Sequence, residues 1–88
     1  MPEVRVKLPA TITTPHPPHE TTCVASDVRE ALRAVAAGSP RYAQRLFFND
    51  RLLVGVLVNG RHVPPSEALT TRLADGDQVE VMPPVAGG

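Results

Sequence analysis

Residues 27–38 read DVREALRAVAAG, which is the clearest helix pattern in the chain. Its apolar side chains recur every three or four residues, so they line one face of a helix. The positions on that face are Val28, Ala31, Leu32, Val35 and Ala36. Ser26 and Asp27 both suit the N-cap, with Glu30 at capping-box spacing from Asp27, and Gly38 is a typical C-terminal stop. The pattern predicts one main helix.

Two strands are expected before this helix. Val4, Val6 and Leu8 alternate with basic residues, which is typical of a half-buried strand. The prolines between residues 9 and 18 predict a loop. Residues 20–25 are rich in β-branched side chains and predict a second strand, antiparallel to the first.

A short helix and a buried strand are expected after it. Ser39 and Pro40 suit the first positions of a second helix, which would place Ala43, Leu46 and Phe47 on one face before Asn49–Asp50 ends it. Residues 52–58 form a continuous apolar run around Gly55, which is typical of a central strand buried on both faces.

The last third of the chain predicts a hairpin and a final strand. Asn59–Gly60 is a strong hairpin signal, residues 61–63 form the return strand, and residues 67–73 are expected to be a helical turn or irregular. Asp75–Gly76 predicts a tight turn before the strand at residues 78–82.

This order of elements predicts an α+β domain with a mixed sheet and one main helix packed on one face. If the last strand lies beside the first, the two run parallel, as in the β-grasp arrangement. We expect the domain to span residues 1–83 and residues 84–88 to be a flexible C-terminal tail.

Composition excludes several classes of protein. The chain has 88 residues, enough for one domain, and its nine basic and nine acidic side chains give a net charge of zero. That balance and the presence of only three aromatic residues argue against nucleic-acid binding. No apolar run is long enough for a membrane helix, and no secretory signal is visible. We therefore expect a cytoplasmic protein, monomeric when free.

Cysteine and histidine do not indicate a metal site or a catalytic site. Cys23 is the single cysteine, without a visible base, and we expect a packed or half-buried thiol. His16 and His19 precede it at a tempting spacing, but a zinc site needs a fourth ligand and a turn that brings the side chains together. We therefore predict no bound metal or cofactor, and an exposed His62.

The C-terminal segment, residues 83–88, reads PPVAGG. Glycine adopts backbone angles closed to other residues, so Gly87–Gly88 suits a narrow channel, while the prolines keep the segment from extending the sheet. This ending resembles that of the MoaD/ThiS-type sulfur carriers, which are ubiquitin-like β-grasp proteins. Val58–Asn59–Gly60 and the LADGD of residues 73–77 also resemble this family.

The resemblance implies that this chain is a co-substrate and not an enzyme. In this family an E1-like adenylating enzyme of the MoeB/ThiF type uses ATP and Mg²⁺ to adenylate the terminal glycine, here Gly88. A sulfur donor protein or sulfide then displaces AMP and leaves a thiocarboxylate, which a downstream synthase uses. By resemblance, the activating enzyme would recognise the tail through Pro84, Val85, Ala86 and Gly87.

Two further functions stay open within this resemblance. The chain could be the small subunit of molybdopterin synthase, or a protein modifier joined to other proteins through Gly88. Lys7 is the only lysine, which disfavours chains of such a modifier but not its attachment to other proteins. The receiving pathway, whether cysteine, a thiosugar or another sulfur-containing metabolite, is not determined by the sequence.

Two groups of side chains are candidates for partner docking. The apolar candidates are Phe47, Phe48 and Leu53. The acidic candidates are Asp75, Asp77 and Glu80, because no basic residue follows Arg72. We expect this acidic end to orient the tail toward a basic entrance on the activating enzyme.

Overall fold

The computed structural model describes residues 2–13, 15, 17–49 and 51–82. The strands are β1 (Glu3–Leu8), β2 (His19–Val24), β3 (Phe47–Phe48), β4 (Arg51–Leu52), β5 (Gly55–Val58), β6 (Arg61–Val63) and β7 (Gln78–Met82). The helices are α1 (Ala10–Thr13), α2 (Val28–Gly38), α3 (Pro40–Leu46) and α4 (Pro65–Ala68). The expected mixed sheet and main helix are confirmed.

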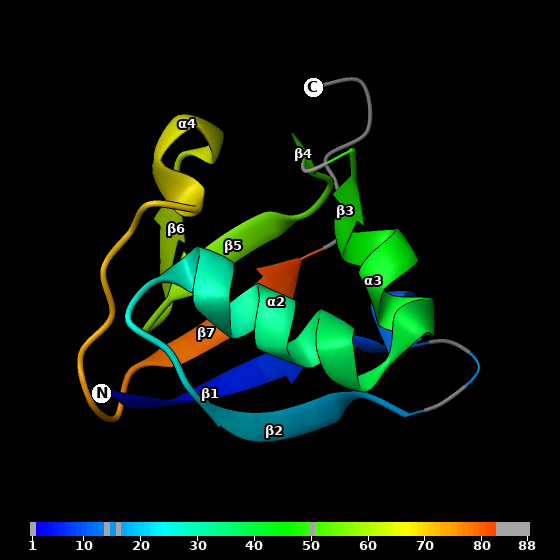
Figure 1. Cartoon of the computed structure of the whole chain (residues 1–88), viewed down its shortest axis with the longest axis horizontal. Coiled ribbons are helices and arrows are strands. Elements are labelled where there is room, and N and C mark those ends of the chain that lie inside the picture. The colour runs from blue at the N-terminus through cyan, green and yellow to red at the C-terminus, as the bar shows by residue number, and fades with distance from the viewer. Residues whose placement is uncertain (1, 14, 16, 50, 83–88) are drawn as a thin grey trace.

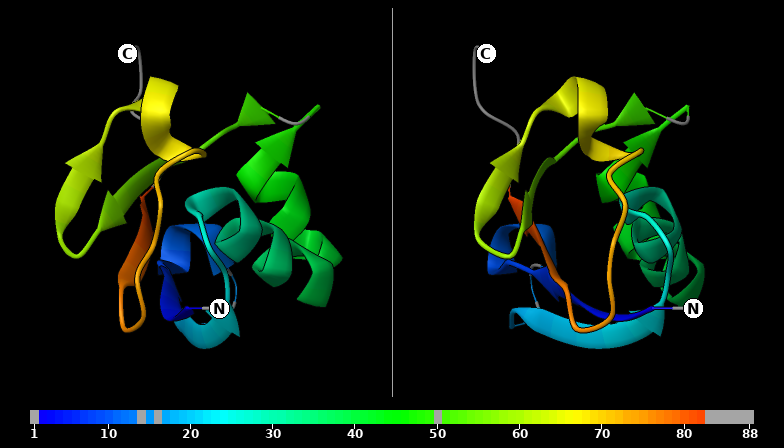
Figure 2. Two further views of the ribbon diagram at one scale, coloured as in Figure 1. Left: turned by 60° about the vertical axis from the view of Figure 1, so that its left-hand side comes forward. Right: turned by 90° about the vertical axis from the view of Figure 1, so that its left-hand side faces the viewer.

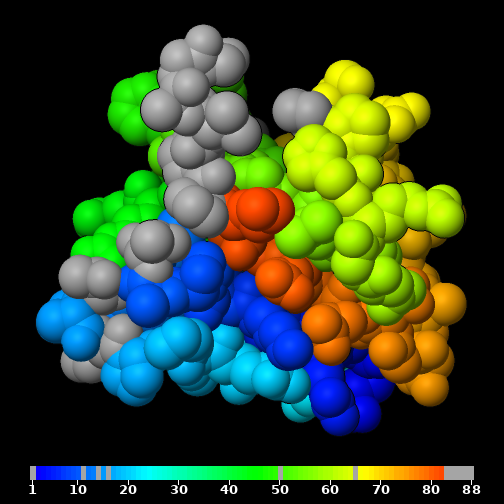
Figure 3. All heavy atoms as spheres, turned by 180° about the vertical axis from the view of Figure 1, so that it is seen from behind, coloured from blue at the N-terminus to red at the C-terminus, as the bar shows by residue number. Residues whose placement is uncertain are grey.

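The main sheet has five strands in the order β2-β1-β7-β5-β6 (Figure 1). β7 is parallel to β1, with Val6 opposite Val79, and antiparallel to β5, with Val56 opposite Val81. Helices α2 and α3 lie on one face of this sheet (Figure 2), and the strands are open on the other face (Figure 3). The last strand therefore lies beside the first and parallel to it, as in the β-grasp arrangement.

The core lies between α2 and the sheet. Alternate side chains of the strands point to the helix, and α2 buries the face predicted from its spacing. The buried residues of these elements are Val4, Val6, Leu8, Val56, Val79, Val81, Val28, Ala31, Leu32 and Val35. Burial of these side chains is the main stabilising term for so small a domain.

Helix α2 is fixed at its N-terminus by Asp27. The Asp27 carboxylate accepts a hydrogen bond of 2.8 Å from the Glu30 amide, so Asp27 and not Ser26 is the cap. At the other end the helix includes Gly38, and the cap is Ser39 with an extended backbone (φ −153°). The expectation that Gly38 lies just beyond the end of the helix is therefore wrong, because Gly38 is its last residue.

The expected continuous strand over residues 52–58 is wrong. Phe47–Phe48 and Arg51–Leu52 form a separate antiparallel pair, β3–β4, and only Gly55–Val58 joins the main sheet. Asn49, with φ +48°, turns the chain between the short strands. Phe47 follows α3, so it is not on a helical face as expected.

The expected loop between the first two strands contains a short helix. In α1 the Ile12 and Thr13 amides donate to the Pro9 carbonyl at 2.9 and 3.1 Å. Ile12 is buried in the core, and the buried Thr13 hydroxyl lies 2.9 Å from the Pro17 carbonyl. The connection is therefore part of the packed domain.

In the described part of the chain, no helix is long and apolar enough to span a membrane.

Candidate functional site

The candidate site begins where β7 ends. The tail residues named from the sequence, Pro84, Val85, Ala86, Gly87 and Gly88, lie outside the described residues, so their roles stay predictions. The structure describes the strand that precedes these residues, β7. β7 lies between β1 and β5, and its last residue, Met82, is paired with Gly55 of β5. The tail segment therefore follows a strand held inside the sheet.

Exposed apolar side chains occur at that end of β7 and on the chain segment that leads into its partner strand β5. Met82 is opposite Gly55 at the start of β5, and Leu53 lies just before this pair in the chain. Phe48 belongs to the β3–β4 pair that precedes Leu53. The exposed fractions are 64% for Phe48, 40% for Leu53 and 41% for Met82. We call these three side chains the exit patch.

The other apolar docking candidate, Phe47, has a different environment. It is half-buried against the core, and the Arg33 guanidinium lies 5.8 Å from the centre of its ring. Phe47 therefore belongs mainly to the packing of the domain, whereas Phe48 points outward. The Leu53 amide donates to the Leu46 carbonyl at 2.8 Å, which attaches this region to the end of α3.

Met82 is a candidate that sequence reasoning missed. Because side chains alternate along a strand, burial of Val79 and Val81 places Met82 on the open face. The same alternation is visible in the sequence, where Val79 and Val81 mark the buried face of the strand.

The acidic candidates do not form one surface. Asp75 and Asp77 precede β7, whereas Met82 ends it. A strand of 5 residues corresponds to about 16 Å. Glu80 lies within β7 on the open face, opposite Lys7 on one side and Leu57 on the other. The proposed steering role of these residues stays a prediction, and Glu80 is the member closest to the exit patch along the strand.

Asp75 and Asp77 have a local role in the turn before β7. Asp75 accepts a 2.9 Å hydrogen bond from the Glu3 amide. Asp77 accepts bonds from the Ala74 amide at 2.7 Å and from the Asn59 side-chain amide at 2.9 Å. These two bonds, the backbone one first, hold the pKa of Asp77 below its usual value. The carboxylates therefore order the turn that starts β7.

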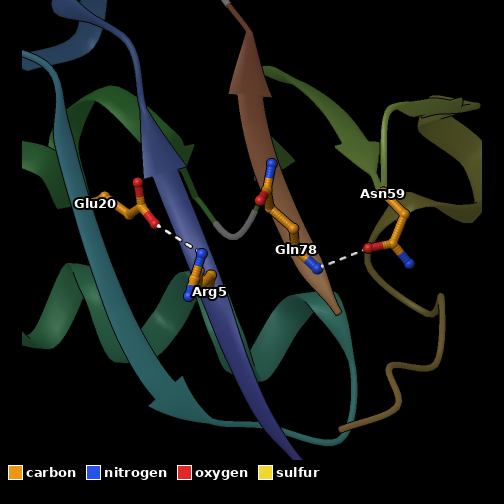
Figure 4. Close-up of polar contacts among 4 residues, drawn as sticks. All are labelled: Arg5, Glu20, Asn59 and Gln78. Atoms are coloured by element: carbon orange, nitrogen blue, oxygen red, sulfur yellow. Dashed lines mark hydrogen bonds and ion pairs between the residues drawn. The ribbon is translucent and has the colours of Figure 1, made fainter. Parts of the chain in front are cut away.

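The Asn59 side chain also reaches β7 directly. Its oxygen accepts a 2.9 Å bond from the Gln78 amide (Figure 4). The backbone N–H of Asn59 in turn donates to the Gln78 carbonyl at 2.8 Å. Asn59 has φ +52° and Gly60 φ +83°, as a tight hairpin turn between β5 and β6 requires. Two of the three motifs that carry the family resemblance thus meet in space.

The expected thiol environment is confirmed at Cys23. It is half-buried against the core, its sulfur lies 4.0 Å from the Ala31 carbonyl, and burial raises the pKa of the thiol. His16 lies outside the described residues, and among those described no three His, Cys, Asp or Glu side chains are grouped as metal ligands. His62 is exposed, as expected.

The chain matches the model of the ThiS family over residues 9–88. It is 43% identical over 63 residues to small archaeal modifier protein 3 of Haloferax volcanii. The matched residues make up 69% of this chain and 68% of the relative.

Solved structures agree with this match. Small archaeal modifier protein 1 of Methanosarcina acetivorans has a TM-score of 0.77 and 28% identity, covering 100% of this chain and 98% of that one. A chain in the BexX/CysO complex of Amycolatopsis orientalis has a TM-score of 0.74 and 28% identity, covering 97% and 99%. Both the sequence match and the fold lead to one conclusion: this chain belongs to the ThiS family of ubiquitin-like β-grasp proteins.

Proposed function

We propose that this protein is a sulfur carrier whose Gly88 carboxylate is adenylated by a partner enzyme and then converted to a thiocarboxylate. The observation that carries the proposal is a Gly-Gly ending on the short segment, residues 83–88, that follows the central strand of a β-grasp sheet. Membership of the ThiS family supports it. A partner would hold the rigid body at the sheet while the last residues enter its active site.

The chemistry requires a partner because a carboxylate is ionised at neutral pH and is a poor electrophile. In the proposed sequence the Gly88 carboxylate attacks the α-phosphate of ATP, and pyrophosphate leaves. Hydrosulfide then attacks the acyl-adenylate, AMP leaves with the bonding electrons, and a thiocarboxylate remains. The ATP and Mg²⁺ belong to the MoeB/ThiF-type partner, and the exchange would take place in the cytoplasm.

The exit patch gives this partner an apolar contact beside the entering tail. Phe48, Leu53 and Met82 are exposed apolar side chains near one end of the sheet. Apolar side chains at the centre of an interface supply much of its binding energy. The patch would therefore hold the body of the carrier against the activating enzyme while residues 83–88 extend inward.

Intact-mass spectrometry tests the proposal. The purified chain is incubated with an adenylating enzyme of this type, ATP, Mg²⁺ and sulfide. We expect a mass increase equal to the replacement of one oxygen by sulfur. A chain lacking Gly87 and Gly88 should fold equally well and show no increase. An unchanged mass of the full chain with a partner shown to be active on another carrier would overturn the proposal.

A second candidate function is protein modification through Gly88. It is favoured by the names of the two archaeal relatives, both of which are small archaeal modifier proteins. In this case the activated Gly88 carbonyl would be attacked by a lysine amine of another protein, with AMP or a thiol as the leaving group. Glycine remnants on lysines in digests of cells that express the tagged chain would be the result to find. Their absence would leave only the carrier role.

A further inference from the structure

The outer edge of β2 is a candidate docking surface. Among the described residues β2 pairs with β1 only, so its other side has no strand neighbour. The Ala25 amide donates to the Pro2 carbonyl at 2.9 Å, so this pair is hydrogen-bonded. Two residues along each strand, Val4 lies opposite Cys23 and is the next hydrogen-bonded pair. Because bonded and non-bonded pairs alternate in an antiparallel ladder, Glu20, Thr22 and Val24 direct their backbone N–H and C=O groups outward.

This edge has few of the features that usually prevent an edge strand from pairing with a further strand. Natural edge strands are commonly short, interrupted by proline, or charged. β2 has 6 residues without proline, and its one carboxylate, on Glu20, lies 3.6 Å from the Arg5 guanidinium on the open face (Figure 4). The opposite edge strand, β6, has only 3 residues and is followed by Pro64. β2 is therefore the edge better suited to pair with another strand.

A hollow of about 300 Å³ lies beside this edge, between β2 and the helices. Thr21 and Cys23 line it from the strand, and Ala34 and Gly38 line it from α2. Because Ala34 and Gly38 are small, α2 leaves space next to the strand. Tyr42 adds an aromatic wall.

The lining favours an uncharged occupant. His19 and Tyr42 lie with their ring centres 6.1 Å apart at the α3 side of the hollow. The remaining lining residues are hydroxyl, thiol or small apolar groups, namely Thr21, Thr22, Cys23, Ala34, Val35, Gly38 and Ser39. A carboxylate or ammonium group placed here would lose water without gaining an ion pair from these side chains. An apolar side chain would gain contact with Val35 and Tyr42.

We propose that the outer edge of β2 and this hollow bind an extended segment of a partner protein, which adds to the sheet beside β2 and places a branched apolar side chain in the hollow. Backbone hydrogen bonds to Glu20, Thr22 and Val24 supply affinity, and the hollow selects the side chain. This binding uses no residue of the tail, so it goes beyond the proposed carrier function.

A second copy of this chain fits the hollow less well. If two copies paired through β2, each would present His19, Thr21 and Cys23 on the helix side. None of these is a branched apolar side chain, so the hollow would stay incompletely filled. A segment of a different protein therefore fits the hollow better than a second copy of this chain.

The test uses the full chain and the peptide acetyl-Lys-Thr-Ile-Thr-Ile-Thr-Lys-amide as a probe, with Val and Leu versions in place of Ile. Amide NMR spectra should show shifts and slowed hydrogen exchange at Glu20, Thr22 and Val24. The same peptide N-methylated at two successive central residues lacks the bonding N–H groups and should not bind. If none of the three peptides shifts these amides at millimolar concentration, the proposal is wrong.

Matched variants test the hollow itself. Ala34→Arg fills it from α2, and Ala37→Arg makes the same change at an exposed position of the same helix outside the lining. We expect Ala34→Arg to weaken peptide binding at least about tenfold and Ala37→Arg to leave it unchanged. Thr22→Pro removes one outward N–H and should also weaken binding. Equal binding by all three folded variants would overturn the proposal, as would a concentration-dependent dimer that occupies β2 without peptide.

Discussion

The side-chain amide of Asn59 donates a 2.9 Å hydrogen bond to the carboxylate of Asp77. The two residues lie in different turns, one between β5 and β6 and the other just before β7. Their contact, together with the bond from the Gln78 amide to Asn59, fixes where β7 begins. The strand that leads to the tail is therefore positioned by a polar junction at its start and by strand pairing along its length.

Asn59→Ala should destabilise the domain by about 2 kcal/mol, because it removes two side-chain hydrogen bonds and places alanine at positive φ. Asn59→Gly removes the same bonds but tolerates the backbone angle (φ +52°), so it should cost less. Urea unfolding of both variants measures the difference. Equal stability of Asn59→Ala and the parent chain would show that the junction is not needed.

Acid should weaken the same junction. The pKa of Asp77 is lowered in the folded chain, chiefly by the Ala74 amide and then by Asn59. A lowered folded pKa stabilises the fold above the unfolded value of about 3.9 and loses this contribution as the pH falls through the folded pKa. Urea midpoints between neutral pH and strong acid should therefore fall less steeply for Asp77→Asn than for the parent. Parallel curves for the two chains would contradict the assignment.

Phe48→Ala should weaken the interaction with the activating enzyme without weakening the fold. Phe48 is 64% exposed, so its truncation should change the stability of the domain little. Truncating an aromatic side chain at the centre of an interface can cost more than about 1 kcal/mol of binding free energy. We expect KM for the carrier in the adenylation assay to rise about fivefold or more.

Val24→Ala is the control for the exit patch. Val24 is 54% exposed and lies on β2, which β1 separates from β7 and Met82, whereas Phe48 belongs to the separate β3–β4 pair. It should leave KM unchanged. An equal rise in KM for both variants, or none for Phe48→Ala, would remove the exit patch from the interface.

Neutralising Asp75, Asp77 and Glu80 together should slow association with the activating enzyme at low salt, because long-range attraction is screened at high salt. The three charges can be tested separately. Glu80→Gln removes a charge from the open face of the sheet, whereas neutralising Asp75 and Asp77 also weakens the turn before β7. Stopped-flow rates for Glu80→Gln and for the Asp75→Asn, Asp77→Asn pair distinguish them. Rates that do not depend on any of the three charges would refute electrostatic steering.

The regular elements of this fold could be predicted from the sequence where one periodicity dominates. The spacing of Val28, Leu32 and Val35 predicts α2, and the alternation in β1 and β7 predicts which residues are buried. The order of elements predicts that these two strands run parallel if they are neighbours, and the structure shows that they are. These patterns are local or depend on simple topology, so one sequence suffices to find them.

The region between α3 and β5 could not be predicted in the same way. An unbroken apolar run has no periodicity, so nothing in residues 52–58 separates the short β4 strand from β5. The turn at Asn49 depends on a left-handed backbone angle (φ +48°), and the pairing of Phe47 with Leu52 depends on how α3 packs. For the same reason the exposure of Leu53 became clear only in the folded chain.

The pairing of β1 with β7 also has a consequence for biosynthesis. These strands come from the two ends of the chain, and β7 fills the gap between β1 and β5. A growing chain on the ribosome therefore lacks the middle of its sheet until Gln78–Met82 has been released from the exit tunnel. The domain is therefore completed only at the end of synthesis, so an incomplete chain would offer the proposed activating enzyme neither a finished sheet nor a tail.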